Sequence, residues 1–107
     1  MRPTLENLET SFYHRGFAWG SISLTTKTDK FSGHVSSISV CREQGLSCVG
    51  VVFDGLKRFP KVESFFGTPS DYQDYMMVFE ISSASEKNGK LTLVTTFGEV
   101  LEFSLAE

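Results

Sequence analysis

The sequence predicts an α+β fold, in which an N-terminal helix packs on a curved, mainly antiparallel sheet of about six or seven strands in meander order. Residues 3–15 have the apolar spacing of a helix, and later segments are short runs rich in β-branched and aromatic residues. Turn dipeptides separate these runs, and consecutive strands usually lie side by side. The length of 107 residues suits a single domain spanning residues 1–107.

The N-terminal helix is expected over residues 3–15. Leu5, Leu8 and Phe12 follow the i, i+3, i+7 spacing of one helical face, which would lie on the sheet. Gly16 follows directly and is a typical residue for ending a helix, because glycine adopts the left-handed conformation without strain.

The first strand is expected over residues 17–26. Strand alternation puts Phe17 and Trp19 on one side, and Ile22 and Leu24 on the other. Trp19 has two interpretations: a binding hot spot, because tryptophan is enriched at such positions, or a core residue, because tryptophan is highly buried on average. Average burial favours the core.

Residues 35–53 are predicted to form a central hairpin, two β-type runs joined by Gln44 and Gly45. Gly45 can supply the positive φ that a two-residue turn needs. This turn places five apolar residues on the core face: Ile38, Val40, Val49, Val51 and Phe53.

The same register makes Cys41 face Cys48 on the other side of the hairpin. In a hydrogen-bonded pair of this kind, the two Cα atoms are about 5.5 Å apart, which a disulfide can span. A disulfide or redox pair is one interpretation. Without a secretory context, two reduced and partly buried thiols are favoured.

The chain after the central hairpin begins with a turn at Asp54 and Gly55. Pro60 cannot donate a ladder hydrogen bond, so residues 56–66 are expected as an edge strand or an irregular crossing. After a loop at residues 67–74, residues 75–81 are apolar on both sides and predict a central strand.

Two hairpins are expected near the C-terminus. Asn88 and Gly89 are a strong hairpin signal. The last pair of strands is expected at residues 90–96 and 100–105, with Gly98 and Glu99 as the turn. That turn gives a core face of Val94, Leu101, Phe103 and Leu105. The apolar residues left on the other face suggest a second buried face or a dimer contact: Leu91, Leu93, Phe97 and Val100.

Charge and hydropathy limit the class of partner. The net charge of −3 and the pI of about 5.3 argue against a nucleic acid or an anionic membrane, which require a basic surface. No apolar run approaches the length of a membrane span, and the N-terminal residues lack the pattern of a signal or transit peptide. A cytoplasmic location is therefore expected.

The sequence predicts no catalytic residues, no metal site and no cofactor, and hence a protein that is not an enzyme. Its two histidines, His14 and His34, lie at no metal-ligand spacing from each other or from a cysteine, and zinc needs three or four ligands. Asp71 and Asp74 lack the apolar surroundings that separate the pKa values of an acid–base pair. The chain contains no glycine-rich phosphate loop.

The predicted partner-binding residues are Asp71, Tyr72, Asp74 and Tyr75. Tyrosine offers a large contact area at low entropic cost, and aspartate offers charge complementarity. Such a loop suits a basic protein partner. The alternative is a solvated loop in which Tyr75 turns into the core.

Three short motifs resemble a group of small bacterial immunity-type proteins from polymorphic toxin systems. They are Phe-Tyr-His-Arg at 12–15, Val-Val-Phe-Asp-Gly-Leu at 51–56 and Thr-Phe-Gly-Glu-Val at 96–100. The family pattern has an aspartate where this chain has Arg15 after an inserted Tyr13, so the role of that aspartate does not carry over. The resemblance implies a non-enzymatic, cytosolic protein that binds another protein.

The leading hypothesis is therefore a small cytosolic protein-binding module, an inhibitor or immunity protein whose partner is basic. One alternative is a small-molecule-binding domain or small enzyme that uses the concave side of the sheet. The other is a self-associating structural subunit, such as a homodimer, built on the second apolar face of the last hairpin.

Overall fold

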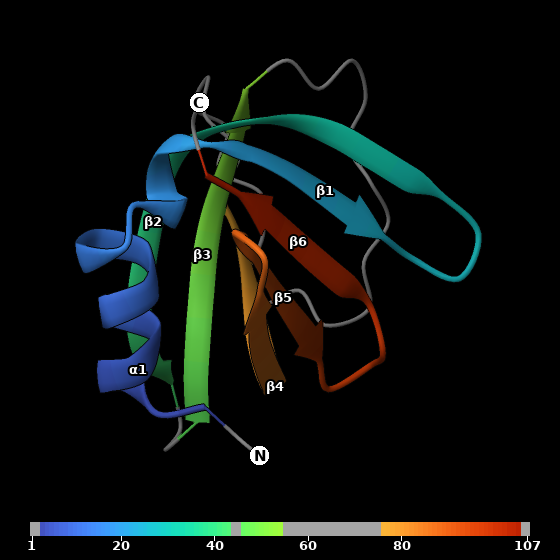
Figure 1. The fold of residues 1–107 in the computed structure, drawn as a ribbon. Coiled ribbons are helices and arrows are strands. Elements are labelled where there is room, and N and C mark those ends of the chain that lie inside the picture. The colour runs from blue at the N-terminus through green and yellow to red at the C-terminus, as the bar shows by residue number, and fades with distance from the viewer. Residues whose placement is uncertain (1–2, 44–45, 55–75, 106–107) are drawn as a thin grey trace.

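The computed structural model describes residues 3–43, 46–54 and 76–105, and in these residues six antiparallel strands form a closed barrel with an N-terminal helical segment beside it (Figure 1). The helical elements are α1 (Leu5–Glu9), the π-helical turn η1 (Thr10–His14) and the 3-10 turn η2 (Phe17–Trp19). The strands are β1 (Ser21–Thr25), β2 (Lys30–Glu43), β3 (Leu46–Asp54), β4 (Met76–Lys87), β5 (Lys90–Thr95) and β6 (Val100–Ser104).

The antiparallel meander order of the prediction is confirmed, but the sheet is closed rather than open. The closing contact is an antiparallel pairing of β1 with β6, in which Ile22 faces Phe103 and Leu24 faces Leu101. The ladders of β2 and β4 each contain an irregularity, between Val35 and Ser37 and at Ser82. Such bulges bend a strand and increase its twist, which brings the two ends of the sheet together.

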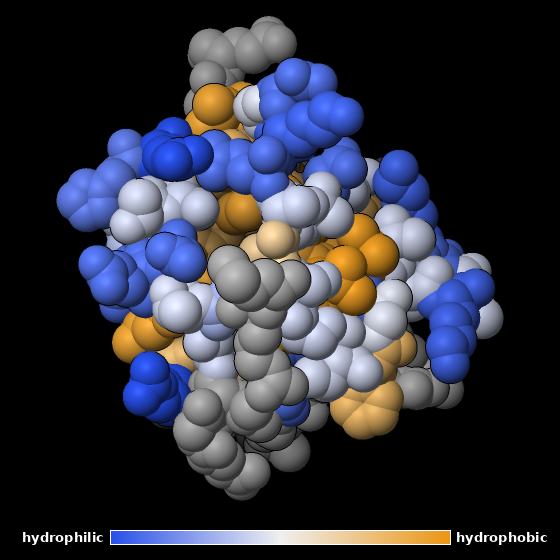
Figure 2. Space-filling view, turned by 60° about the horizontal axis from the view of Figure 1, so that its bottom comes forward, coloured by the Kyte–Doolittle hydropathy of each residue, from blue (hydrophilic) through white to orange (hydrophobic). Residues whose placement is uncertain are grey.

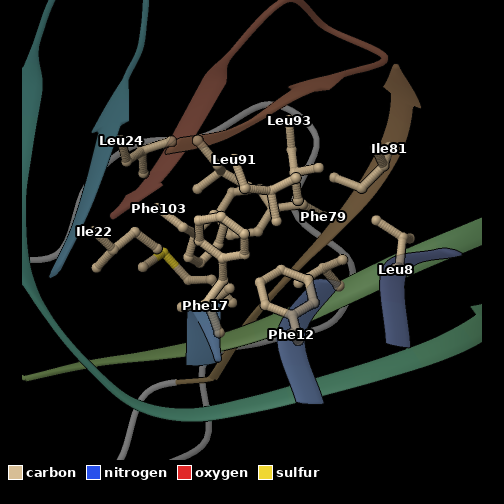
Figure 3. Packing of buried hydrophobic residues seen from close by; sticks show 14 of the residues in the cluster. Leu8, Phe12, Phe17, Ile22, Leu24, Phe79, Ile81, Leu91, Leu93 and Phe103 are labelled. Atoms are coloured by element: carbon tan, nitrogen blue, oxygen red, sulfur yellow. The ribbon is translucent and has the colours of Figure 1, made fainter. Parts of the chain in front are cut away.

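The interior of the barrel is filled by apolar side chains from every strand and from the helical segment (Figure 3). Leu8 and Phe12 enter from the helical turns and Phe17 enters from η2, each no more than 1% exposed. The rings of Phe12 and Phe103 pack edge to face, with centroids 4.9 Å apart. The helical segment therefore supplies part of the barrel core.

The expected helix is present, but its two halves differ. The Thr4 hydroxyl accepts a hydrogen bond from the Asn7 amide at 3.1 Å and caps α1, as threonine does at this position. After Glu9 the chain widens into a π turn, in which the Arg15 amide donates to the carbonyl of Thr10 at 3.0 Å. Gly16, with φ of 88°, ends the segment where the sequence predicts.

The register predicted for the central hairpin is confirmed. Val40 faces Val49, Ile38 faces Val51 and Cys41 faces Cys48 in the β2–β3 ladder. Val49 and Val51 are fully buried, while Ile38, Val40 and Phe53 pack against the edge of the core.

The β4–β5 hairpin also forms where Asn88 and Gly89 predict it. Their φ values of 54° and 75° are the pair of positive angles that a type I′ turn requires. In β4, Met77, Phe79 and Ile81 point into the core, as predicted. The expectations for residues 55–75, including the edge segment with Pro60, lie outside the described residues.

The register predicted for the last hairpin is wrong. In the β5–β6 ladder Leu91 faces Phe103 and Leu93 faces Leu101, so both leucines point into the barrel. The loop contains three residues rather than two: the Gly98 amide donates to the Thr95 carbonyl at 3.0 Å, and Gly98 has φ of 86°. The odd loop length reverses the faces of β5, so Leu91 and Leu93 leave the outer face on which a dimer contact was predicted, whereas Phe97 is exposed.

The strand predicted over residues 17–26 is also corrected. Residues Phe17–Trp19 form η2, and β1 begins only at Ser21. Gly16 in the left-handed conformation and Gly20 at φ −107°, ψ −160° bound the turn, so strand alternation does not apply to it. Phe17 is buried, whereas Trp19 is 77% exposed, which contradicts the expected core position.

Candidate partner-binding surface

The loop residues proposed from sequence, Asp71, Tyr72, Asp74 and Tyr75, lie outside the residues that the structure describes. A candidate site is therefore built from exposed apolar side chains of the described chain. Four large apolar side chains are exposed there: Tyr13, Trp19, Phe97 and Leu105. They belong to different regions of the barrel, and their surroundings differ.

Trp19 and Leu105 lie at the same end of the barrel. Ser21 and Ser104 face each other in the β1–β6 ladder. Gly20, which precedes Ser21, and Leu105, which follows Ser104, therefore lie at the same end of the barrel. Figure 1 shows the end of β6 next to the chain that leads from α1 into β1. We refer to the surface formed by η2, the β4–β5 turn and the end of β6 as the Trp19 end.

Leu105 is held at the Trp19 end by two glycines. Its amide lies 3.4 Å from the Gly89 carbonyl, and its methyl groups come within 4 Å of where a Cβ would stand on Gly16 or Gly89. Trp19 is tied to the same place, because its amide donates to the Gly16 carbonyl at 3.1 Å. Backbone hydrogen bonds therefore hold the main chain of both residues at this end. Their side chains are exposed nonetheless, Leu105 by 40% and Trp19 by 77%.

Two ion pairs lie on the elements that meet at the Trp19 end. Arg15 forms an ion pair with Glu86 at 2.7 Å and connects the helical segment to the end of β4. Lys90, which faces Ser104 in the ladder, pairs with Glu102 at 3.5 Å. An exposed aromatic anchor with a polar rim is the anatomy of a protein–protein contact.

Tyr13 has a structural role despite being 51% exposed. Its hydroxyl donates to the Ile38 carbonyl at 3.2 Å and joins the π turn to β2. On the same helical segment, Glu6 and Glu9 are exposed to solvent and add negative charge to this side of the molecule.

The opposite end of β5 and β6 carries Phe97, and we refer to the loop at 95–99 as the Phe97 end. The Thr95 hydroxyl donates to a carboxylate oxygen of Glu99 at 2.6 Å and accepts from the Glu99 amide at 3.1 Å. Thr95 and Glu99 are 1% and 6% exposed, so these bonds hold the loop from inside. Figure 2 is turned so that the bottom of Figure 1 comes forward, and it shows apolar groups in small patches between polar ones.

The described residues contain no cluster of three or more histidine, cysteine, aspartate or glutamate side chains that could hold a metal ion. His14 and His34 are both exposed. Among the same residues, none of the helices has the length and apolar character needed to cross a membrane.

No protein-family model, curated protein or solved structure matches this chain. The surface geometry therefore carries the functional conclusion. Sequence patterns identified Trp19 as a possible hot spot but favoured its burial, because the break at Gly20 was not recognised. The presence of Trp19 and Leu105 at the same end of the barrel has no local sequence signal, because it depends on the pairing of β1 with β6.

Proposed function

We propose that this protein is a small protein-binding module that acts as an inhibitor or immunity protein for a partner with a basic surface. The observation that carries the proposal is the exposure of Trp19 and Leu105 at the same end of the barrel, on a backbone held by hydrogen bonds and with ion pairs on the elements that meet there. A protein-binding role requires no catalytic group at this surface.

The size of the tryptophan side chain supports a role as an anchor. An aromatic side chain offers roughly 200 Å² for burial, and apolar burial contributes about 25 cal/mol per Å². Because Trp19 is 77% exposed, its burial in a partner would contribute about 4 kcal/mol before the entropic cost of association. Tryptophan is one of the residue types that most often dominate binding energy.

The charge of the chain supports a basic partner. The net charge is −3, and the exposed Glu6 and Glu9 lie on the helical segment that leads to Trp19. Opposite charge on the partner would accelerate association and orient the encounter. In the motifs that resemble the immunity-type family, Phe12 and Val51 are core residues and Arg15 pairs with Glu86, so these three residues have structural roles.

The two alternatives have less support from the described residues. A ligand-binding concave face would need open space, whereas the described barrel interior is filled by side chains. The self-associating subunit was predicted from Leu91, Leu93, Phe97 and Val100; both leucines point into the core, which leaves Phe97 as the one large exposed apolar side chain of that set.

The test compares Trp19→Ser with Phe97→Ser, a matched change of an exposed aromatic residue at the other end of the barrel. Tagged wild-type and variant proteins are used as bait in cells of the source organism, and the partner is then purified for titration. We expect one stoichiometric partner with the wild type and with Phe97→Ser. Trp19→Ser should weaken binding by about 30-fold, which corresponds to a hot spot of about 2 kcal/mol.

Equal binding by Trp19→Ser and wild type would contradict the proposed surface, and the lack of any stoichiometric partner would contradict the proposed function. The basic character of the partner is tested separately by the salt dependence of association. The association rate should fall as ionic strength rises. A rate that is independent of salt would contradict a basic partner while leaving the Trp19 surface intact.

A further inference from the structure

The structure places two cysteines directly opposite each other in the central hairpin. Cys41 of β2 faces Cys48 of β3, and both are present as thiols. Cys41 is half-buried, whereas Cys48 is completely buried. The neighbouring pair, Val40 and Val49, points to the other face, so the two cysteine side chains share the outer side of the barrel wall.

The hydrogen bond from Tyr13 identifies the kind of strand pair that the cysteines form. The Tyr13 hydroxyl donates to the Ile38 carbonyl, so this carbonyl points away from β3. Ile38 and Val51 are therefore a non-hydrogen-bonded pair, and the alternation along an antiparallel ladder makes Cys41 and Cys48 a hydrogen-bonded pair.

The expected separation suits a disulfide. In a hydrogen-bonded antiparallel pair the Cα atoms are about 5.5 Å apart. Disulfide-bonded cysteines have Cα separations of about 4.4–6.8 Å. The separation of this strand pair therefore lies within the range that a disulfide spans.

We propose that Cys41 and Cys48 are a redox-modification site, which forms a reversible cross-strand disulfide by exchange with a low-molecular-weight disulfide such as oxidised glutathione. The thiolate of Cys41 attacks one sulfur of the small disulfide, forms a mixed disulfide and releases one thiol. The thiolate of Cys48 then attacks the Cys41 sulfur, forms the protein disulfide and releases the second thiol. The two protein thiols are oxidised, and the small disulfide is reduced to two thiols.

The difference in burial shows which cysteine attacks the small disulfide and which one attacks the mixed disulfide. Cys41 is the thiol that a solute can reach, so it is the attacking residue. Cys48 is fully buried but lies directly opposite, so it reacts with Cys41 rather than with a solute. Oxidation would join β2 covalently to β3, next to the strand region that Tyr13 contacts.

The test treats the folded protein with oxidised glutathione and follows thiol content and intact mass. The wild type should lose both thiols and two hydrogen atoms of mass, form no disulfide between two chains, and recover both thiols with dithiothreitol. Cys48→Ser should stop at the glutathione adduct on Cys41. Cys41→Ser should react at least tenfold more slowly than Cys48→Ser, because only the buried thiol remains.

A matched control moves the accessible thiol along the same face. In the double variant Ser39→Cys with Cys41→Ser, the new cysteine is diagonal to Cys48, at about 7–8 Å. This variant should accumulate the mixed disulfide rather than the protein disulfide.

The proposal is overturned if the wild type retains a stable glutathione adduct, or if neither of its thiols reacts while the denatured protein does. Equal formation of the protein disulfide by the diagonal variant would also overturn it, because the direct register would then be irrelevant. Circular dichroism of each variant confirms that the compared proteins are folded.

Discussion

The two ends of the barrel are built differently. At the Phe97 end, one loop is held from inside by the buried Thr95–Glu99 hydrogen bonds. At the Trp19 end, three separate segments meet, and surface contacts such as Arg15–Glu86 join them. The comparison shows that a local loop can stabilise itself, whereas a surface assembled from distant segments depends on the closure of the whole barrel.

The largest expected effect comes from Phe12, which joins the helical segment to the barrel. Phe12→Ala should lower the free energy of unfolding by about 3–5 kcal/mol, because it removes a fully buried ring that packs on Phe103. Phe97→Ala, which removes a ring that is 52% exposed, should change it by less than about 0.5 kcal/mol. Urea unfolding of both variants measures the difference, and similar losses would contradict the assigned core.

The buried hydrogen bonds of the Phe97 end should give the next largest effect. Thr95→Val keeps the shape of the side chain but removes the two hydrogen bonds that the hydroxyl makes with Glu99, so we expect a loss of about 1–3 kcal/mol. Thr92→Val, a partly exposed position on the same strand, is the control. Equal stability of Thr95→Val and wild type in chemical unfolding would show that these bonds do not hold the loop.

Gly16 and Gly98 allow the backbones of the two ends to be compared directly. Both have left-handed φ values, 88° and 86°, so replacement by alanine should cost about 1–2 kcal/mol at either position. A Cβ at Gly98 meets nothing within 4 Å, while one at Gly16 lies at ordinary contact distance from Leu105. Gly16→Ala should therefore be the milder change in thermal unfolding, and the reverse order would contradict the Leu105 contact.

The smallest expected effect belongs to the ion pair at the Trp19 end. The side chains of Arg15 and Glu86 are 57% and 29% exposed, so Arg15→Ala should cost only about 0.2–1 kcal/mol. The cost should shrink further at high salt. A double-mutant cycle with Glu86→Ala, measured at low and high ionic strength, checks this. A coupling energy between Arg15 and Glu86 that does not change with salt concentration would contradict this prediction.

Sequence patterns predicted those elements whose geometry is set by neighbouring residues. The register beside Gln44–Gly45 was predicted from a two-residue turn, and the structure confirms its pairings; Asn88–Gly89 predicted a hairpin, and β4 and β5 form it. The β5–β6 register failed because Gly98 is the third residue of its loop, and one additional residue reverses every side chain of β5.

The closure of the barrel and the exposure of Trp19 could not be predicted in the same way. The β1–β6 pairing joins segments almost the full chain apart, and no local pattern encodes it. Trp19 is exposed because Gly16 and Gly20 interrupt the strand pattern on either side of η2. The predicted loop residues 71–75 stay a prediction.

The π-helical turn makes the length of the N-terminal segment a structural constraint. A π turn accommodates one residue more than the equivalent α-helical turn. Loss of one residue from Thr10–His14 would convert the π turn into an α-helical turn and change the spacing between the residues on either side of the deletion. Phe12 and Arg15 could not then both keep their contacts with Phe103 and Glu86. The additional residue thus acts as a spacer that matches the helical segment to the barrel, and we expect substitution of the exposed His14 to be tolerated better than its deletion.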